Sequence, residues 1–124
     1  MNSKVFMVLR ILLGLFVLVF GLNKFLHFIP MGEMSQEAGA YFGALVSTKT
    51  LTLVAVVEIV AGLALIFNKF GALWALILMS VSINAVLFHA TLDPAGIAGS
   101  LVLLILNILV LYRYKKKYKD LLNG

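Results

Sequence analysis

Lys24 and Glu58 are the residues best suited to chemistry, because each is an ionisable side chain within a long apolar stretch. A charge in the hydrocarbon core of a membrane costs at least about 2.5 kcal/mol on insertion scales, so each charge needs a partner. Side chains lean toward the N-terminus of their helix, and helices on these two stretches would run in opposite directions, so the ammonium and carboxylate groups are expected to converge. The pair could fix the register of two helices, or it could serve as a proton relay or as a polar site for a bound head group.

Other polar and small residues recur at helical spacing with these charges. At about 100° per residue, one face of the third apolar stretch carries Ile77, Ser80, Asn84 and Phe88. Small residues let helices approach closely and polar side chains in lipid need partners, so we expect such faces to meet inside a bundle. Asn84 and Asn107 are expected to donate hydrogen bonds to the charged pair. The predicted buried polar network is Lys24, Glu58, Ser80, Asn84, Ser100 and Asn107, and the predicted helix-packing glycines are Gly14, Gly21, Gly62 and Gly96.

The two histidines, His27 and His89, stand near the ends of the first and third apolar stretches. Neutral imidazoles at a common depth could ligate a haem from two sides or hydrogen-bond to a quinone carbonyl. They could also be amphipathic residues beside the lipid head groups, or bind a metal together with Asp93 or Glu33. We carry forward quinone or haem as the cofactor hypotheses, assign no metal site, and assign no residue a catalytic role.

The composition excludes a soluble globule. The 124 residues are 63% hydrophobic and 12% charged, with a mean hydropathy of +1.10, so the apolar excess must face lipid. The sequence has no cysteine, which excludes disulfides, thiolate catalysis and iron–sulfur ligation by this chain. The net charge of +5 does not indicate nucleic-acid binding, because five of the ten basic residues crowd into 113–119 at the end of an apolar stretch.

Four stretches are long and apolar enough to cross a membrane, at about 5–28, 50–67, 70–91 and 95–114. Backbone groups in lipid must be satisfied within the segment, so these stretches are predicted to be helices. Short connections at 68–69 and 92–94 predict antiparallel neighbours. The predicted class is all-α, an integral membrane protein with one domain over 1–124 built as an up-down bundle of four transmembrane helices.

Smaller elements are predicted at the connections. Pro30 should end the first helix, and Ser35 should cap a short interfacial helix within the loop 29–49. Asp93 is expected to cap the last helix, with Pro94 at its first position. The first stretch resembles a signal peptide, but no small-residue cleavage site follows it, so we expect it to be retained.

Basic residues predict the orientation in the bilayer. One side has eight near the helix ends and the other has Lys49 and Lys24, so the positive-inside rule predicts cytoplasmic N- and C-termini in the cytoplasmic (inner) membrane. The basic tail 113–124 is expected to act as a topology anchor that also meets anionic lipid. The eight residues are Lys4, Arg10, Lys69, Arg113, Lys115, Lys116, Lys117 and Lys119.

Three stretches together resemble the DoxX family of small four-helix bacterial membrane proteins: RILLGLFVLVFGLNKFLHFIP, VVEIVAGLALIFNKFGAL and NAVLFHATLDPAG. The resemblance covers nearly the whole chain. The first stretch corresponds to a family pattern through Arg10, Gly14, Gly21 and Lys24, and the second corresponds to an E-x-x-x-G motif through Glu58 and Gly62.

The resemblance implies a link to redox chemistry, since some DoxX relatives are parts of membrane oxidoreductase assemblies, including thiosulfate:quinone oxidoreductase. We therefore expect an accessory membrane subunit associated with quinone-linked oxidoreductase chemistry through a membrane or periplasmic partner, rather than a stand-alone enzyme. A non-catalytic scaffold for other membrane proteins is the alternative. A pathway for protons or small solutes in a homo-oligomer is a third hypothesis.

Overall fold

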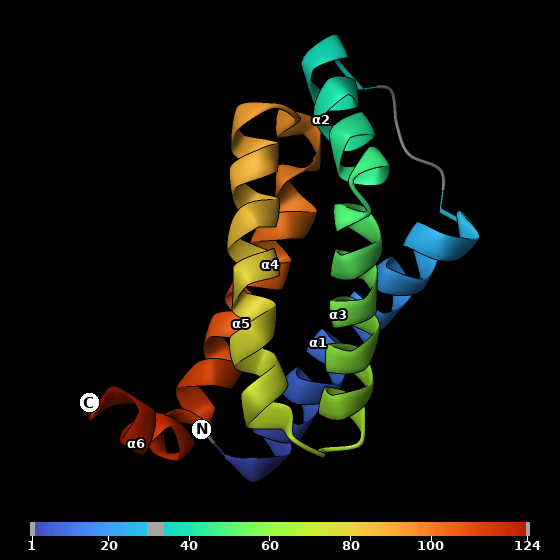
Figure 1. The fold of residues 1–124 in the computed structure, drawn as a ribbon. Helices are drawn as coiled ribbons and strands as arrows, with labels where there is room; N and C mark the ends of the chain where they lie inside the picture. Colours follow the sequence, from blue (N-terminus) through green and yellow to red (C-terminus); the bar gives the residue numbers. More distant parts are fainter. Residues whose placement is uncertain (1, 30–33, 124) are drawn as a thin grey trace.

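Helices account for nearly all of the chain in the computed structural model, which describes residues 2–29 and 34–123 (Figure 1). No strand occurs within those residues, so the predicted all-α class is confirmed. In chain order the elements are α1 (Ser3–Leu26), α2 (Gln36–Ser47), α3 (Thr50–Ile66), α4 (Gly71–Thr91), η1 (Pro94–Gly96), α5 (Ile97–Arg113), η2 (Lys115–Tyr118) and α6 (Lys119–Leu122).

Three helical segments are long and apolar enough to cross a membrane: α1, α4, and the segment Pro94–Arg113 that joins η1 to α5. The second predicted stretch, 50–67, differs from these, because α3 has only 17 residues and would span about 26 Å at 1.5 Å per residue. It passes the same test together with α2, from which it is bent by 79°. The described residues thus contain three membrane-capable helices, or four when the bent pair counts as one.

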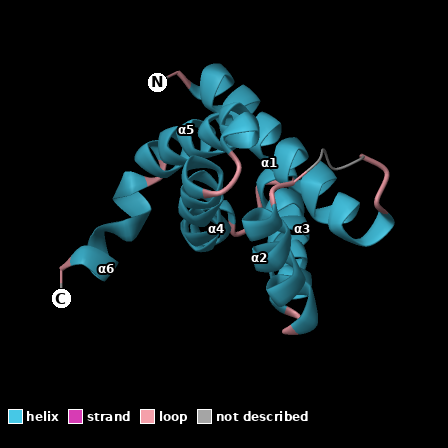
Figure 2. Ribbon diagram, turned by 90° about the horizontal axis from the view of Figure 1, so that it is seen from above, coloured by secondary structure: helices cyan, strands magenta, loops and turns pink. Residues whose placement is uncertain are grey.

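The helices pack in two pairs, α1 against α3 and α4 against α5, and the pairs are joined through α3–α4 and α1–α5 contacts (Figure 2). Fully buried aliphatic side chains fill the centre, among them Leu13, Leu65 and Leu78. Many large apolar side chains lie on the outside instead, such as Leu53 at 64% exposure and Phe67 at 67%. A protein that is apolar both inside and outside suits a lipid surrounding.

Side chains cap the first two helices, α1 and α2. The Ser35 hydroxyl accepts a hydrogen bond from the Ala38 N–H at 3.1 Å, which confirms the predicted cap of α2. Asn2 caps α1 in the same way by accepting from the Lys4 and Val5 N–H groups. The predicted start of the last helical segment is confirmed in position, because Asp93 is the N-cap residue of η1 and Pro94 is its first residue. The Asp93 side chain makes no capping hydrogen bond, however, and contacts the His89 ring instead.

The lower end in Figure 1 holds both termini and the α3–α4 connection. There the Tyr114 hydroxyl donates to Asn68 Oδ1 at 3.2 Å, and the Tyr118 hydroxyl donates to the Ala72 carbonyl at 2.6 Å. Burial, together with neighbouring Tyr114, raises the pKa of Tyr118 to about 12. The Tyr118 hydroxyl therefore stays protonated at neutral pH and keeps the tail docked on the start of α4.

Candidate functional site

Lys24 of α1 and Glu58 of α3 form an ion pair, with 2.6 Å between Nζ and Oε1. The Glu58 side chain is only 4% exposed, whereas that of Lys24 is 23% exposed. The Lys24 ammonium also lies 3.5 Å from the Phe20 carbonyl oxygen, one turn earlier in α1. The structure therefore brings together the two charges that the sequence placed within apolar helices.

Gly21 is what allows the two helices to come so close at this pair. A Cβ atom added at Gly21 would lie 3.0 Å from the Glu58 Cβ and 3.1 Å from the Ala55 carbonyl oxygen. Contacts at that distance force a neighbour to move, so a larger residue would push α1 away from α3. Glycine at this position thus keeps Lys24, less than one turn further along α1, within reach of the carboxylate.

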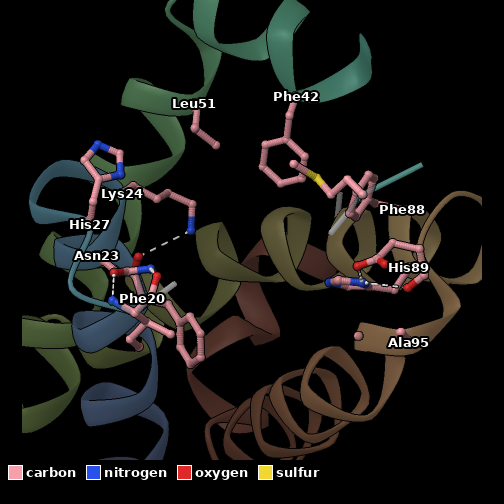
Figure 3. Close-up of a pocket in the computed structure, with 13 residues that line it drawn as sticks. Phe20, Asn23, Lys24, His27, Phe42, Leu51, Phe88, His89 and Ala95 are labelled. Atoms are coloured by element: carbon pink, nitrogen blue, oxygen red, sulfur yellow. Dashed lines mark hydrogen bonds and ion pairs between the residues drawn. The ribbon is translucent and has the colours of Figure 1, made fainter. Parts of the chain in front are cut away.

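The Lys24 side chain also lines a cleft of about 480 Å³, here called the upper cleft. Its apolar lining includes Phe20, Phe42, Leu51 and Phe88, and its polar lining includes Asn23, His27, His89 and Asp93 (Figure 3). Phe88 is held in place by Phe42, with the two ring centroids 5.0 Å apart. Clefts of this size, mostly apolar with a few polar groups, are typical of sites for small ligands.

His89 is oriented within the upper cleft by the segment that follows α4. Its Nδ1 lies 3.0 Å from Asp93 Oδ2 and 3.1 Å from the Asp93 carbonyl oxygen. A neutral ring that donates through Nδ1 keeps Nε2 as its acceptor nitrogen. Gly96 makes room for the ring, because a Cβ there would lie 2.5 Å from His89 Cε1.

The family model of DoxX matches residues 5–91 of the chain. The chain belongs to the DoxX family. The matched region contains α1 to α4, and with them the Lys24–Glu58 pair and His89. No curated protein and no solved structure gives a significant match.

The two histidines of this DoxX protein lie on different sides of the upper cleft. His27 ends α1, with a left-handed backbone conformation at φ 53°, and its side chain is exposed. Figure 3 shows its ring beside Lys24, with His89 across the cleft near Ala95. A metal site with Asp93 finds no support, because no cluster of three or more metal-ligating side chains occurs in the described part of the chain. Glu33, the other proposed ligand, lies outside the described residues.

The prediction that two asparagines support the ion pair is wrong. Asn84 is exposed and donates to the Tyr41 hydroxyl of α2 at 3.2 Å. Asn107 is fully buried, but it donates to the Ala75 carbonyl at 3.0 Å and accepts from the Ser82 hydroxyl at 2.6 Å. It therefore joins α5 to α4 and does not reach Glu58.

The two predicted serines also lie apart from the ion pair. Ser80 is exposed and Ser100 is buried, yet each hydroxyl donates to a carbonyl of its own helix, that of Ile77 and that of Ile97. The face of α4 predicted from the sequence is right for Phe88, which is buried, but wrong for Ser80 and Asn84, because Ser82 faces the interior instead. The buried positions of α4 are Gly71, Ala75, Leu78, Ser82 and Phe88.

The other predicted packing glycines lie at the α1–α3 crossing. A Cβ at Gly14 would lie 2.9 Å from the Gly62 carbonyl oxygen, and one at Gly62 would lie 2.8 Å from the Gly14 carbonyl oxygen. The two backbones thus touch directly, as small residues permit in membrane helices. Gly96 serves differently, because the side chain it accommodates is that of His89 and not a neighbouring helix.

Arg10 has a role that its position near a helix end did not suggest. Its side chain is buried at 7% exposure, and Nη1 donates to the carbonyls of Leu65 and Ile66 at the end of α3. A guanidinium at a helix C-terminus satisfies unpaired carbonyls and complements the helix dipole. Arg10 precedes Gly14 by four residues, which places it on the face of α1 that crosses α3. This spacing is the sequence feature that indicates its burial.

Proposed function

We propose that this DoxX protein is a membrane subunit that binds the head group of a quinone in the upper cleft and acts with a partner protein in an oxidoreductase. The observation that carries the proposal is the cleft itself, which combines aromatic side chains with the Lys24 ammonium and the His89 imidazole. Because the sequence has no cysteine and no nucleotide-binding motif, the partner would supply the electron-transfer group.

The chemistry of the cleft suits a quinone in two respects. A quinone ring is flat and apolar on its faces, and Phe20, Phe42 and Phe88 offer aromatic surfaces for it. One of its carbonyl oxygens can accept a hydrogen bond from the Lys24 ammonium, and the acceptor Nε2 of His89 suits a hydroxyl of the reduced quinol.

Quinone binding can be tested on protein purified in a mild detergent. Mass spectrometry of the solvent extract should detect co-purifying quinone, and equilibrium dialysis should measure binding of a short-chain quinone. Replacing Phe20 by Ala removes one aromatic wall and should weaken binding about tenfold. Phe25→Ala is the matched control, because Phe25 lies on the same helix, is 47% exposed and does not line the cleft. A quinone-free preparation with no measurable binding would reject the proposal.

A non-catalytic scaffold is the second candidate, and the α1–α3 contact favours it. Arg10, the Gly14–Gly62 crossing and the Lys24–Glu58 pair all hold the same two helices together. A scaffold that uses the pair only for structure should keep its partner complex in a folded Glu58→Gln variant and should contain no quinone. Co-purification of a tagged form with its partners, followed by quinone analysis, distinguishes the two functions.

We also propose that the protein crosses the cytoplasmic membrane four times as an up-down bundle, with α2 and α3 together as one bent span and both termini in the cytoplasm. The asymmetry of charge supports this placement. The α1 start, the α3–α4 connection and the tail, which carry eight basic residues, lie at one end of the molecule (Figure 1). Basic residues accumulate on the cytoplasmic side of membrane proteins.

A further inference from the structure

A second cleft, here called the lower cleft, lies at the opposite end of the bundle from the upper cleft. Its volume is about 780 Å³. The start of α4, the start of α1 and the docked tail enclose it, through Gly71, Ala72, Phe6 and Tyr114. It contains no residue of the upper cleft, so it is a separate site at the end where the basic residues gather.

The lower cleft is strongly cationic. Arg113, Lys116 and Lys117 line it, and none of the described residues that line it is acidic. The Arg113 guanidinium is positioned over the Phe6 ring, 5.2 Å from its centroid. Because Tyr118 anchors the tail to the Ala72 carbonyl, the two lysines are held against the bundle. Three cations around one hollow favour an anion, and guanidinium and ammonium groups bind phosphate well.

An apolar groove of about 430 Å³ adjoins this cleft along the α3–α4 connection. Val60, Leu63 and Trp74 line the groove, and Phe70 lines both the groove and the lower cleft. The Phe70 side chain is 78% exposed, although it is large and apolar. A cationic cleft beside an apolar groove matches a molecule with an anionic head and a hydrocarbon tail. Inorganic phosphate and nucleic acids have no such tail.

We propose that the lower cleft binds an anionic phospholipid, with its phosphodiester between Arg113, Lys116 and Lys117 and one acyl chain along the groove beside Phe70. Basic pockets at the membrane surface are known to hold anionic head groups in this manner. The proposal does not depend on quinone binding, because the upper cleft shares no residue with the lower one.

Trp74 provides the test, because it lines the groove and is the single tryptophan of the sequence. The protein is placed in phosphatidylcholine nanodiscs with increasing amounts of brominated phosphatidylglycerol or brominated phosphatidylcholine. Bromine quenches tryptophan fluorescence on contact, so the two curves report which lipid occupies the groove. Brominated phosphatidylglycerol should quench Trp74 at a several-fold lower fraction of the bilayer than brominated phosphatidylcholine does.

Two double variants, each of which removes two positive charges, test whether the lipid preference arises in the lower cleft. Lys116→Gln with Lys117→Gln should reduce the lipid preference by about fivefold or more. Lys115→Gln with Lys119→Gln should preserve the preference, because neither residue lines the lower cleft.

Equal quenching by both lipids in the unmodified protein would overturn the proposal. An equal loss in both double variants would also overturn it, since the tail would then act as a diffuse charge. Loss of the preference on adding inorganic phosphate at constant ionic strength would show a phosphate site without lipid selectivity.

Discussion

At the level of single residues, the Lys24–Glu58 pair combines a buried carboxylate with an ammonium at the edge of a cleft. Glu58 is almost completely buried, while Lys24 is partly exposed and borders the upper cleft. The carboxylate therefore holds in place an ammonium that a ligand can reach. Removing charge from water is costly, and a buried pair repays that cost only when both partners are present. Removing one charge should therefore affect stability very differently from removing both.

Replacing Lys24 by Met should therefore destabilise the protein more than replacing both charges. The single variant leaves the buried Glu58 without its counter-charge and should lower the free energy of unfolding by about 3–5 kcal/mol. The Lys24→Met/Glu58→Met variant removes both charges and should recover most of this loss. The stability of the unmodified protein and of the two variants is measured in detergent by following the loss of helical circular dichroism on heating. Equal destabilisation of the single and double variants would show that the ammonium does not compensate the carboxylate.

At the level of helices, α1 and α3 make direct backbone contact at their glycines, whereas the other helices contact each other through side chains. The Gly14 and Gly62 backbones face each other with no room for a Cβ on either. By contrast, a Cβ at Gly43 in α2 would meet no atom within 4 Å. The chain therefore provides tight and open glycines for comparison.

Gly62→Ala should destabilise the protein, because its new methyl group meets the Gly14 carbonyl at 2.8 Å and the Leu18 Cβ at 2.9 Å. Overpacking against backbone costs about 1–3 kcal/mol. Gly43→Ala should instead raise stability by about 0.5–1 kcal/mol, since alanine is the better helix former and nothing obstructs it. Thermal unfolding in one detergent compares them. A crossing that tolerates Gly62→Ala as well as it tolerates Gly43→Ala would contradict the packing described here.

How far the sequence predicts these contacts depends on what each helix carries. The buried faces of α1 and α3 include charged residues, whose cost in lipid restricts them to the interior, and glycines, which allow the two helices to approach closely. On α4 the apolar residues surround the helix, because lipid is as apolar as the core, so hydrophobicity gives no direction. Asn84 was accordingly placed inside, although the Tyr41 hydroxyl of α2 satisfies it near the surface. The side-chain partners of Arg10 and Asp93 likewise come from tertiary contacts or local turns that spacing alone does not specify.

At the level of the whole molecule, the two clefts lie at opposite ends of one bundle. The upper cleft combines Lys24 and His89 with aromatic walls, while the lower cleft is cationic and faces the tail. Under the proposed topology the first would open near the outer surface and the second near the cytoplasmic surface. Quinone exchange and lipid anchoring would then use different sides of the membrane, so each can be measured without disturbing the other.

This topology can be tested cleanly because the sequence contains no cysteine, so any introduced cysteine is the only reactive thiol. Gln36 at the start of α2 and Asn123 near the end of the tail are both exposed. With cytoplasmic termini, a membrane-impermeant maleimide added to intact spheroplasts should label Gln36→Cys but not Asn123→Cys. Permeabilisation should make both labelling yields equal, which serves as the control for reactivity. Labelling of Asn123→Cys but not Gln36→Cys in sealed spheroplasts would reverse the orientation. Labelling of both would require an even number of crossings between them, so that α2 and α3 could not act as one bent span beside α4 and α5.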